Sequence, residues 1–400
     1  MNELSHKPPA PRLEPRLREI LDAEFPRFSD AEMRRRREAV HQVMEQADVS
    51  HLLLCGAGFR GSAVPWLTHR SVTTEVVAVL TPGEKDAMFV QYFNHLPMAK
   101  RQAVDADVHW GGASTIASVA DELKRRGAAG KRVGVFGPMG FSQRDALAGV
   151  CADVVNLNGA YARLRLVKSD EELDWFRIGA SLCDVAIDAL SVQLRSGLDE
   201  HDLADIVERS YTPWGARTVI HFFGVTSMRN PNLEVPAQFT STRKIDPGDV
   251  VFTEISATFG EYSGQVLRTY AVEEDPTPLY KDLTDVAQAA YEAIKAAARP
   301  GARPEALIEA SSVIEDAGFT TCDDLVHGYG GGYFQPIIGS KSRQNEPPPD
   351  MVLQENMLMV IQPNVTTLDG KAGVQTGECV RITADGAVSI HDAPPGLIQV

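Results

Sequence analysis

The second half of this 400-residue chain repeats one pattern of secondary structure, and this repeat is the strongest constraint on its fold. The segment that begins at Arg195, RSGLDEHDLADIV, resembles the segment that begins at Arg299, RPGARPEALIEAS. Each places a glycine between the end of one helical pattern and the start of the next. Strand patterns follow both, and Ile245–Ile255 matches Leu353–Pro363, where a turn leads into an apolar strand that ends on a polar side chain. Two such halves predict pseudo-twofold packing, with a pocket where they meet.

The first half alternates short strand patterns with helical ones, which predicts a smaller α/β domain. A helical pattern covers residues 114–126, and apolar runs typical of strands cover residues 51–55, 76–80, 87–90 and 132–136. A capping box, Ser169 to Glu172, then starts a long helix that continues to about Leu194. Because 400 residues exceed what one core usually organises, we expect an α/β (α+β) protein in three parts. These are a polar leader (residues 1–30), an N-terminal domain (31–160) and a C-terminal domain (161–400).

Composition and charge argue against several classes of function. The formal net charge of −15 repels phosphate backbones, so we expect no nucleic-acid partner. No window reaches the roughly 18 consecutive apolar residues of a membrane helix, and the N-terminus has no apolar signal core. We therefore expect a cytoplasmic protein without membrane contact. The five cysteines form no CxxC pair, which predicts reduced and mostly buried thiols.

Five polar residues of the C-terminal half lie at strand ends, where a polar side chain is costly to bury without a partner. They are Glu254, Gln265, His327, Gln362 and Glu378. Taken singly, each also fits a solvated strand end. Taken together, they predict one shared site.

Six motifs, in their order and spacing, resemble the creatinase, aminopeptidase P and methionine aminopeptidase family, which has the pita-bread fold. The matching stretches are RLRLVKSDEEL, STRKIDPGD, GEYSGQVLRTYAV, HGYGGG, MLMVIQP and ECVRITADG. In the first half, WLTHRSVTTEVVAVLTPGE resembles the N-terminal domain of the creatinase and aminopeptidase P branch. The resemblance covers roughly residues 30–395. It implies a creatinase-like N-terminal domain, a pita-bread catalytic domain with pseudo-twofold symmetry, and a homodimer.

In metal-dependent members of that family, two Asp, one His and two Glu hold two divalent ions, and the resemblance places these positions on the five polar residues named above. Only His327 and Glu378 keep the family's residue type, Glu254 keeps the charge, and the other two are neutral amides. Since two carboxylates are too few to offset two dications, we expect no tightly bound metal cofactor. The alternative is a single divalent ion (Zn, Mn or Fe) held by Glu254, His327 and Glu378.

Two further positions depart from the family. The resemblance places two family histidines on Ala237 and Phe334, and a neighbouring acid on Gln335. The site therefore differs from that of a standard aminopeptidase. Because creatinase itself has lost metal ligands and hydrolyses a C–N bond, we predict a creatinase-like hydrolase. Its substrate would be a small molecule with an amide or amidine-like bond.

Such chemistry needs a base, an acid and hydrogen bonds to the substrate. Glu254 and Glu378 are the candidates for base and substrate anchor, and His327 is the candidate proton donor. Gln265 and Gln362 would orient a small polar substrate through their amides.

Other residues are candidates for contact with the substrate. They are Tyr262, Tyr333, Phe334, Arg268 and His221. Core packing is an equal expectation for Tyr333 and the favoured one for His221. Arg381, which strand alternation turns away from Glu378, is expected to make a structural contact.

Other functions stay open. The same residues fit a metal-dependent Xaa-Pro aminopeptidase or dipeptidase, a lyase on the same scaffold, and a non-catalytic pita-bread protein that binds peptides. The retained polar residues favour an enzyme.

Overall fold

The computed structural model describes residues 8–343 and 347–400, and these form two compact units. The smaller unit is Ala23–Arg165, and the larger combines residues 166–400 with the chain up to Asp22. The chain passes from the smaller unit to the larger between Arg165 and Leu166. The leader is not a separate part, because α1 (Pro15–Asp22) belongs to the larger unit and Ser181 Oγ donates to the Arg12 carbonyl at 3.1 Å. Residues 1–7 of the predicted leader lie outside the described residues.

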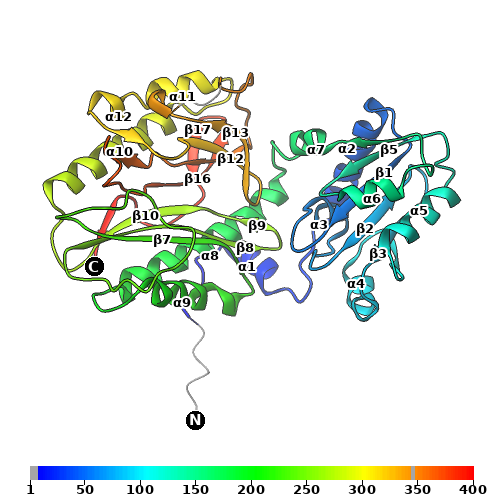
Figure 1. Ribbon diagram of the computed structural model, residues 1–400, viewed down its shortest axis with the longest axis horizontal. Coiled ribbons are helices and arrows are strands. Elements are labelled where there is room, and N and C mark those ends of the chain that lie inside the picture. Colours follow the sequence, from blue (N-terminus) through cyan, green and yellow to red (C-terminus); the bar gives the residue numbers. More distant parts are fainter. Residues whose placement is uncertain (1–7, 344–346) are drawn as a thin grey trace, which may run out of the picture. The chain divides into compact units, whose positions relative to one another are not determined.

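The smaller unit is a six-stranded mixed sheet in the order β4-β3-β2-β1-β5-β6, with helices packed against it (Figure 1). Its strands are β1 (His51–Gly56), β2 (Val76–Leu80), β3 (Asp86–Val90), β4 (Ala106–Trp110), β5 (Arg132–Phe136) and β6 (Asp153–Asn156). Its helices are α2 (Asp30–Gln46), α3 (Ala63–Thr68), α4 (Leu96–Gln102), α5 (Thr115–Arg125), α6 (Phe141–Ala146) and α7 (Asn158–Leu164). The predicted strands and helix are confirmed. The additional strands β4 and β6 form the two edges of the sheet, where burial is low and the apolar pattern is weak.

The larger unit is built on a ten-stranded sheet whose main path is β13-β12-β14-β16-β10-β8-β7. Its strands are β7 (Arg217–Ser227), β8 (Asp249–Phe259), β9 (Tyr262–Ser263), β10 (Val266–Ala271), β12 (Val326–Tyr329), β13 (Tyr333–Ile338), β14 (Leu358–Ile361), β16 (Gly377–Thr383), β17 (Gly386–Ser389) and β18 (Leu397–Gln399). A separate two-stranded ladder pairs β11 (Thr320–Thr321) with β15 (Val365–Thr366). The helices are α8 (Asp170–Gln193), α9 (Glu200–Tyr211), α10 (Pro278–Ala297), α11 (Pro304–Ala310) and α12 (Val313–Asp316).

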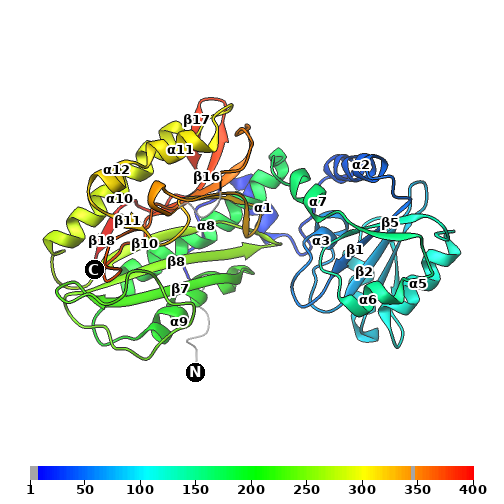
Figure 2. The same cartoon turned by 45° about the horizontal axis from the view of Figure 1, so that its top comes forward.

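The internal repeat of the sequence is visible in this unit. In each half a long helix ends, a glycine with positive φ follows (Gly197, 85°; Gly301, 84°), and a shorter helix begins. The helices α8 and α9 lie along β7 and β8, while α10 and α11 lie beside the strands of the other half (Figure 2). Antiparallel pairing of β10 with β16 joins the two halves. The predicted duplicated architecture is therefore confirmed.

Local sequence signals explain where the main helix of the larger unit starts. Ser169 Oγ accepts from the main-chain N–H of Glu172 (3.2 Å), and Glu172 Oε2 accepts from the main-chain N–H of Ser169 (3.1 Å). This is the predicted capping box. Within the described part of the chain, no helix has the length and apolar character needed to cross a bilayer.

Candidate active site

Four of the five predicted polar residues lie on one face of the ten-stranded sheet. Glu254 of β8 lies opposite Leu267 of β10. Gln265 comes two residues before Leu267, so its side chain points to the same face of the sheet as that of Glu254. His327 of β12 lies opposite Val360 of β14, and Gln362 comes two residues after Val360, so the side chains of His327 and Gln362 also share one face. A hydrogen bond between the two glutamines (3.4 Å) connects the pairs, which come from different halves of the domain. These four side chains therefore form one group on this face of the sheet.

The two glutamines form a directed chain of hydrogen bonds. Gln265 Nε2 donates to Glu254 Oε1 (2.6 Å) and to Gln362 Oε1 (3.4 Å). Gln362 Nε2 donates to Asp323 Oδ2 and to the Asp324 main-chain carbonyl, both at 3.2 Å. Since an amide has two N–H groups, the donors of both glutamines are directed at protein acceptors. The structure therefore places them as supports of Glu254, whereas we predicted that they orient the substrate.

Asp323 is a site residue that the sequence did not reveal. Its Oδ2 accepts from Gln362 and from Asn364 Nδ2 (3.4 Å), and burial raises the pKa of its carboxyl group. It lies four residues before His327, in a turn rather than at a strand end. The available signal was the pair of acids at 323–324 directly before an apolar strand.

The environment of Glu254 favours its neutral form. Burial, followed by the nearby charge of Asp323, raises the pKa of Glu254 to about 8. Glu254 therefore carries a proton over most of the neutral range. It is better suited to donate a proton than to act as the predicted base.

His327 has the opposite character. Its side chain is 1% exposed, and burial lowers its pKa to about 4, against smaller contributions from the Gly328 carbonyl and Gln362. His327 Nδ1 lies 2.9 Å from the Gly328 carbonyl oxygen, which can only accept, so the ring proton belongs on Nδ1 and Nε2 keeps its lone pair. We predicted a proton donor, but the structure supplies a neutral imidazole that accepts.

Glu378 lies away from this group. It pairs across the sheet with Val266 and Ile361, so strand alternation directs its side chain to the face opposite Glu254. Arg268 Nη2 donates to Glu378 Oε2 (2.5 Å) and Tyr291 Oη donates to Oε1 (3.1 Å). Burial alone would raise the pKa of Glu378, but Arg268 and then His391 lower it, so the carboxylate is ionised. The expectation that Glu378 joins the site as a substrate anchor is not met.

Gly377 occupies the position that faces the site on β16. It lies opposite Leu267, which in turn lies opposite Glu254, so all three point to the same face. A Cβ atom at Gly377 would lie 2.0 Å from the Ile361 carbonyl oxygen, and its φ is +137°. The β16 strand therefore contributes no side chain to the site at this position.

Removing the Glu378 carboxylate is expected to destabilise the fold rather than disable the chemistry. Arg268 is 2% exposed, so Glu378→Ala leaves a buried guanidinium without its acid and should lower the free energy of unfolding by about 3–5 kcal/mol. Urea denaturation measures this loss. Asp121→Ala, which removes the acid from the exposed pair with Lys124, is the control and should change stability by less than about 1 kcal/mol. A loss as small as the control's would mean that the pair is unimportant.

The remaining predicted contacts divide between the site and the core. Arg268 also donates to the main-chain carbonyls of residues 267, 377, 393 and 394, so it holds the C-terminal segment and does not clamp a substrate. Tyr262 packs with Trp175 and Phe176, with ring centroids 5.5 and 5.0 Å apart, which is a core position. His221 pairs with Ile255, on the face opposite Glu254.

One aromatic side chain lies beside the site, and one arginine behaves as expected. The ring of Tyr333 lies 4.4 Å from that of His327, and Tyr333 is 55% exposed, which excludes a core role. Phe334 pairs with Gly328, which strand alternation places on the face opposite His327, and Lys168 Nζ lies 5.8 Å from its ring centre. Arg381 donates to Asn356 Oδ1 through Nε (3.0 Å) and Nη2 (2.7 Å), which is the expected structural contact.

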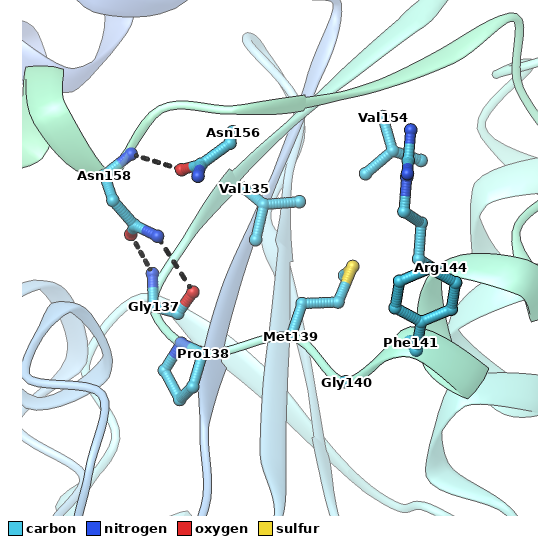
Figure 3. Close-up of a pocket in the computed structure, with 10 residues that line it drawn as sticks. All are labelled: Val135, Gly137, Pro138, Met139, Gly140, Phe141, Arg144, Val154, Asn156 and Asn158. Atoms are coloured by element: carbon cyan, nitrogen blue, oxygen red, sulfur yellow. Dashed lines mark hydrogen bonds between the residues drawn. The ribbon is translucent and has the colours of Figure 1, made fainter.

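The smaller unit contains a separate pocket of about 450 Å³ beside β5 and β6. Asn158 lines it and bonds the main chain of Gly137 on both sides, donating to its carbonyl (3.3 Å) and accepting from its N–H (2.7 Å) (Figure 3). Arg144 and Phe141 of α6 lie across the pocket from Asn158 (Figure 3). This lining has one basic residue and no acid or histidine, so it lacks an acid–base pair for hydrolysis.

Comparison with known proteins identifies the family. The model of metallopeptidase family M24 matches residues 174–384, more than half of the 400 residues. The chain belongs to metallopeptidase family M24. It is 30% identical over 248 residues to the Mycobacterium tuberculosis protein named "Probable dipeptidase PepE", covering 60% of this chain and 62% of that protein. The Xaa-Pro dipeptidase of Pyrococcus furiosus is 25% identical over 226 residues, which are 56% of this chain and 62% of that protein.

The chain therefore spans less than two thirds of the length of these relatives. Solved structures match more of it. A prolidase from Thermococcus sibiricus superposes with a TM-score of 0.80 at 18% identity, over 93% of this chain and 100% of the other. The dipeptidase PepE of Mycobacterium ulcerans gives 0.74 at 24% identity, over 94% and 100%. These similarities confirm the predicted pita-bread fold.

The family name implies divalent metal ions, and the donors on this chain do not fit a pair of them. Gln265 and Gln362 direct N–H groups into the network, where metal ligands must present lone pairs. Across the residues that the structure describes, no three His, Cys, Asp or Glu side chains are grouped to hold an ion. The single-ion alternative with Glu254, His327 and Glu378 does not assemble, because Glu378 lies on the opposite face.

Proposed function

We propose that this protein hydrolyses the C–N bond of a short peptide. The dipeptidase names of its M24 relatives favour a peptide over the amide or amidine-like small molecule expected from the creatinase resemblance. One observation carries the proposal on this chain: a neutral histidine and a protonated carboxylic acid lie on the same face of the sheet. Such a pair supplies the base and the acid that amide hydrolysis needs.

His327 is the proposed base. With the Nδ1 proton held by the Gly328 carbonyl, Nε2 takes a proton from water as the water oxygen bonds to the substrate carbonyl carbon. Glu254, held by Gln265, donates its proton to the nitrogen as the C–N bond breaks. Solvent returns the proton from His327 to Glu254, so protons balance over one turnover. Tyr333, exposed beside His327, is proposed to contact the substrate.

Turnover of a dipeptide panel that includes Xaa-Pro substrates tests this proposal. We expect release of free amino acids, with one ¹⁸O atom from labelled water in the new carboxylate. Cleavage without label would indicate lyase chemistry on the same scaffold. Binding of peptides without any cleavage would indicate the non-catalytic alternative.

The metal requirement is decided by a separate measurement. The relatives favour the metal-dependent dipeptidase alternative, whereas the donor set favours hydrolysis by the chain's own acid and base. We expect substoichiometric Zn, Mn and Fe in the purified protein and turnover that survives chelation. Stoichiometric metal with chelator-sensitive turnover would establish the metal-dependent alternative.

The homodimer, the cytoplasmic location and the creatinase-like character of the N-terminal domain remain predictions. Light scattering after size-exclusion chromatography measures the first. A mass near 43.5 kDa would contradict the dimer, since that is the mass of one chain.

A further inference from the structure

We propose that Asp323 is the positioning residue of this site: its carboxylate orients Gln362 and, through Gln362, Gln265. This inference rests on the proposed function for its catalytic consequence, but the orientation itself can be measured without activity. Asp323 has no counterpart among the five strand-end positions that carry the family resemblance. Its role follows from the hydrogen bonds that this chain makes.

The first step is the orientation of Gln362. The two ends of its amide have nearly the same shape, so only its partners decide which end points where. Asn364 Oδ1 accepts from a main-chain N–H, so its Nδ2 donates to Asp323 Oδ2 (3.4 Å) and this oxygen is an acceptor. The same oxygen lies 3.2 Å from the amide nitrogen of Gln362. The Asp324 carbonyl, on the same side of Gln362, also accepts. The NH2 end of Gln362 must therefore face Asp323.

The second step passes this orientation to the other half of the domain. With its NH2 end turned to Asp323, Gln362 presents Oε1 to Gln265, which must then supply Nε2. The same Nε2 donates to Glu254 Oε1 at 2.6 Å. The Asp323 carboxylate, together with the Asp324 carbonyl beside it, thus determines the direction of both amides. The acid that they hold lies at the far end of the chain of hydrogen bonds.

The third step is the anchoring of Asp323 itself. Asn364 is fully buried, and its Oδ1 accepts from the main-chain N–H of Thr376 (3.3 Å) while its Nδ2 donates to Asp323. The oxygen that accepts from Gln362 is therefore also held by Asn364, whose own direction is set by the main chain. Supports of this kind fix the geometry of a site before substrate arrives.

Side-chain amide signals of Gln265 and Gln362 in ¹⁵N-labelled protein test the inference directly. Each pair of NH2 resonances is assigned by its loss in Gln265→Glu and Gln362→Glu. Asp323→Ala removes the side-chain acceptor and leaves only the Asp324 carbonyl, so both pairs should move away from their wild-type positions, although Asp323 touches only one of the glutamines. Asp323→Asn keeps an oxygen that can accept and should leave both pairs near their wild-type positions. Asp385→Asn, in an exposed turn, is the charge-matched control and should move neither.

Each outcome is decisive. A change in the Gln362 signals alone, or in neither pair, overturns the inference, because the orientation would then not pass to Gln265. If Asp323→Ala does not fold, Asp323→Ser provides a second side chain too short to reach Gln362, with the same expected shifts.

Kinetics separate a failure of this inference from a failure of the proposed function. If the wild type turns over a dipeptide, Asp323→Ala should lower kcat about 10- to 100-fold with little change in KM, and Asp323→Asn should restore most of it. If the wild type turns over none, the proposed hydrolysis fails while the NMR result still decides the role of Asp323. An equal loss in both Asp323 variants would mean that charge, not orientation, is what Asp323 supplies.

Discussion

Glu254→Gln is expected to lower kcat about 10³-fold while leaving the fold intact. The substitution removes the proton that Glu254 is proposed to donate to the leaving nitrogen. The new amide has nearly the same shape and keeps an oxygen that accepts from Gln265 Nε2, so the chain of hydrogen bonds can persist. Steady-state kinetics on the dipeptide substrate measures the loss.

The same substitution should stabilise the protein above neutral pH. Because the pKa of Glu254 is raised from 4.5 to about 8, the folded state keeps a proton that the unfolded chain releases between these values. Stability from this group is complete below pH 4.5 and is lost as pH rises to about 8, by at most about 5 kcal/mol at about 1.4 kcal/mol per pKa unit. Glu254→Gln removes this loss, so its advantage over the wild type should grow between pH 5 and pH 8.5.

Glu355→Gln is the matched control, since Glu355 is exposed and the substitution makes the same chemical change. It should alter neither turnover nor the pH dependence of unfolding. Turnover in Glu254→Gln within a few fold of the wild type would exclude Glu254 as the acid. An unchanged pH dependence would show that Glu254 is ionised at neutral pH in the folded protein.

The sequence predicted the architecture well because the signals there are redundant. The helix that begins at Ser169 is specified by a capping box and a long apolar pattern, and the repeat specifies the second half from the first. Edge strands such as β4 carry little apolar pattern, so nothing local marked them. Their positions follow from tertiary pairing.

The site was predicted less completely, because facing direction and protonation are three-dimensional properties. Glu378 and Gly377 are neighbours, and a difference of one residue in a strand reverses the face to which a side chain points. A match between short sequence motifs does not show which of these two adjacent residues points into the site. Asp323 lies in a turn, where no periodicity draws attention to a polar residue. The sequence suggested Glu254 as the base and His327 as the proton donor. Burial raises the pKa of Glu254 and lowers that of His327, which reverses these roles, and the sequence does not specify this burial.

The double variant Gln265→Asp, Gln362→Glu is expected to acquire a site for one divalent ion. It replaces two inward-directed amides by carboxylates on the face that already holds Glu254 and His327, giving four potential ligands. Three or four such ligands suffice for Zn²⁺ or Mn²⁺. Isothermal titration of Zn²⁺ and Mn²⁺ into chelator-treated protein, with elemental analysis of the complex, should show one ion per chain where the wild type binds none tightly.

Gln42→Asp with Gln354→Glu adds the same charge at exposed positions and controls for non-specific attraction of cations. Equal affinity in both double variants, or none in either, would mean that Glu254, His327 and the two glutamines do not converge as described. Adding Gly377→Glu should not complete a dinuclear centre, because a Cβ atom there would lie 2.0 Å from the Ile361 carbonyl. We therefore expect these variants to bind one divalent ion per chain at most. The strand geometry around Gly377, and not only the two amides, separates this chain from a two-metal site.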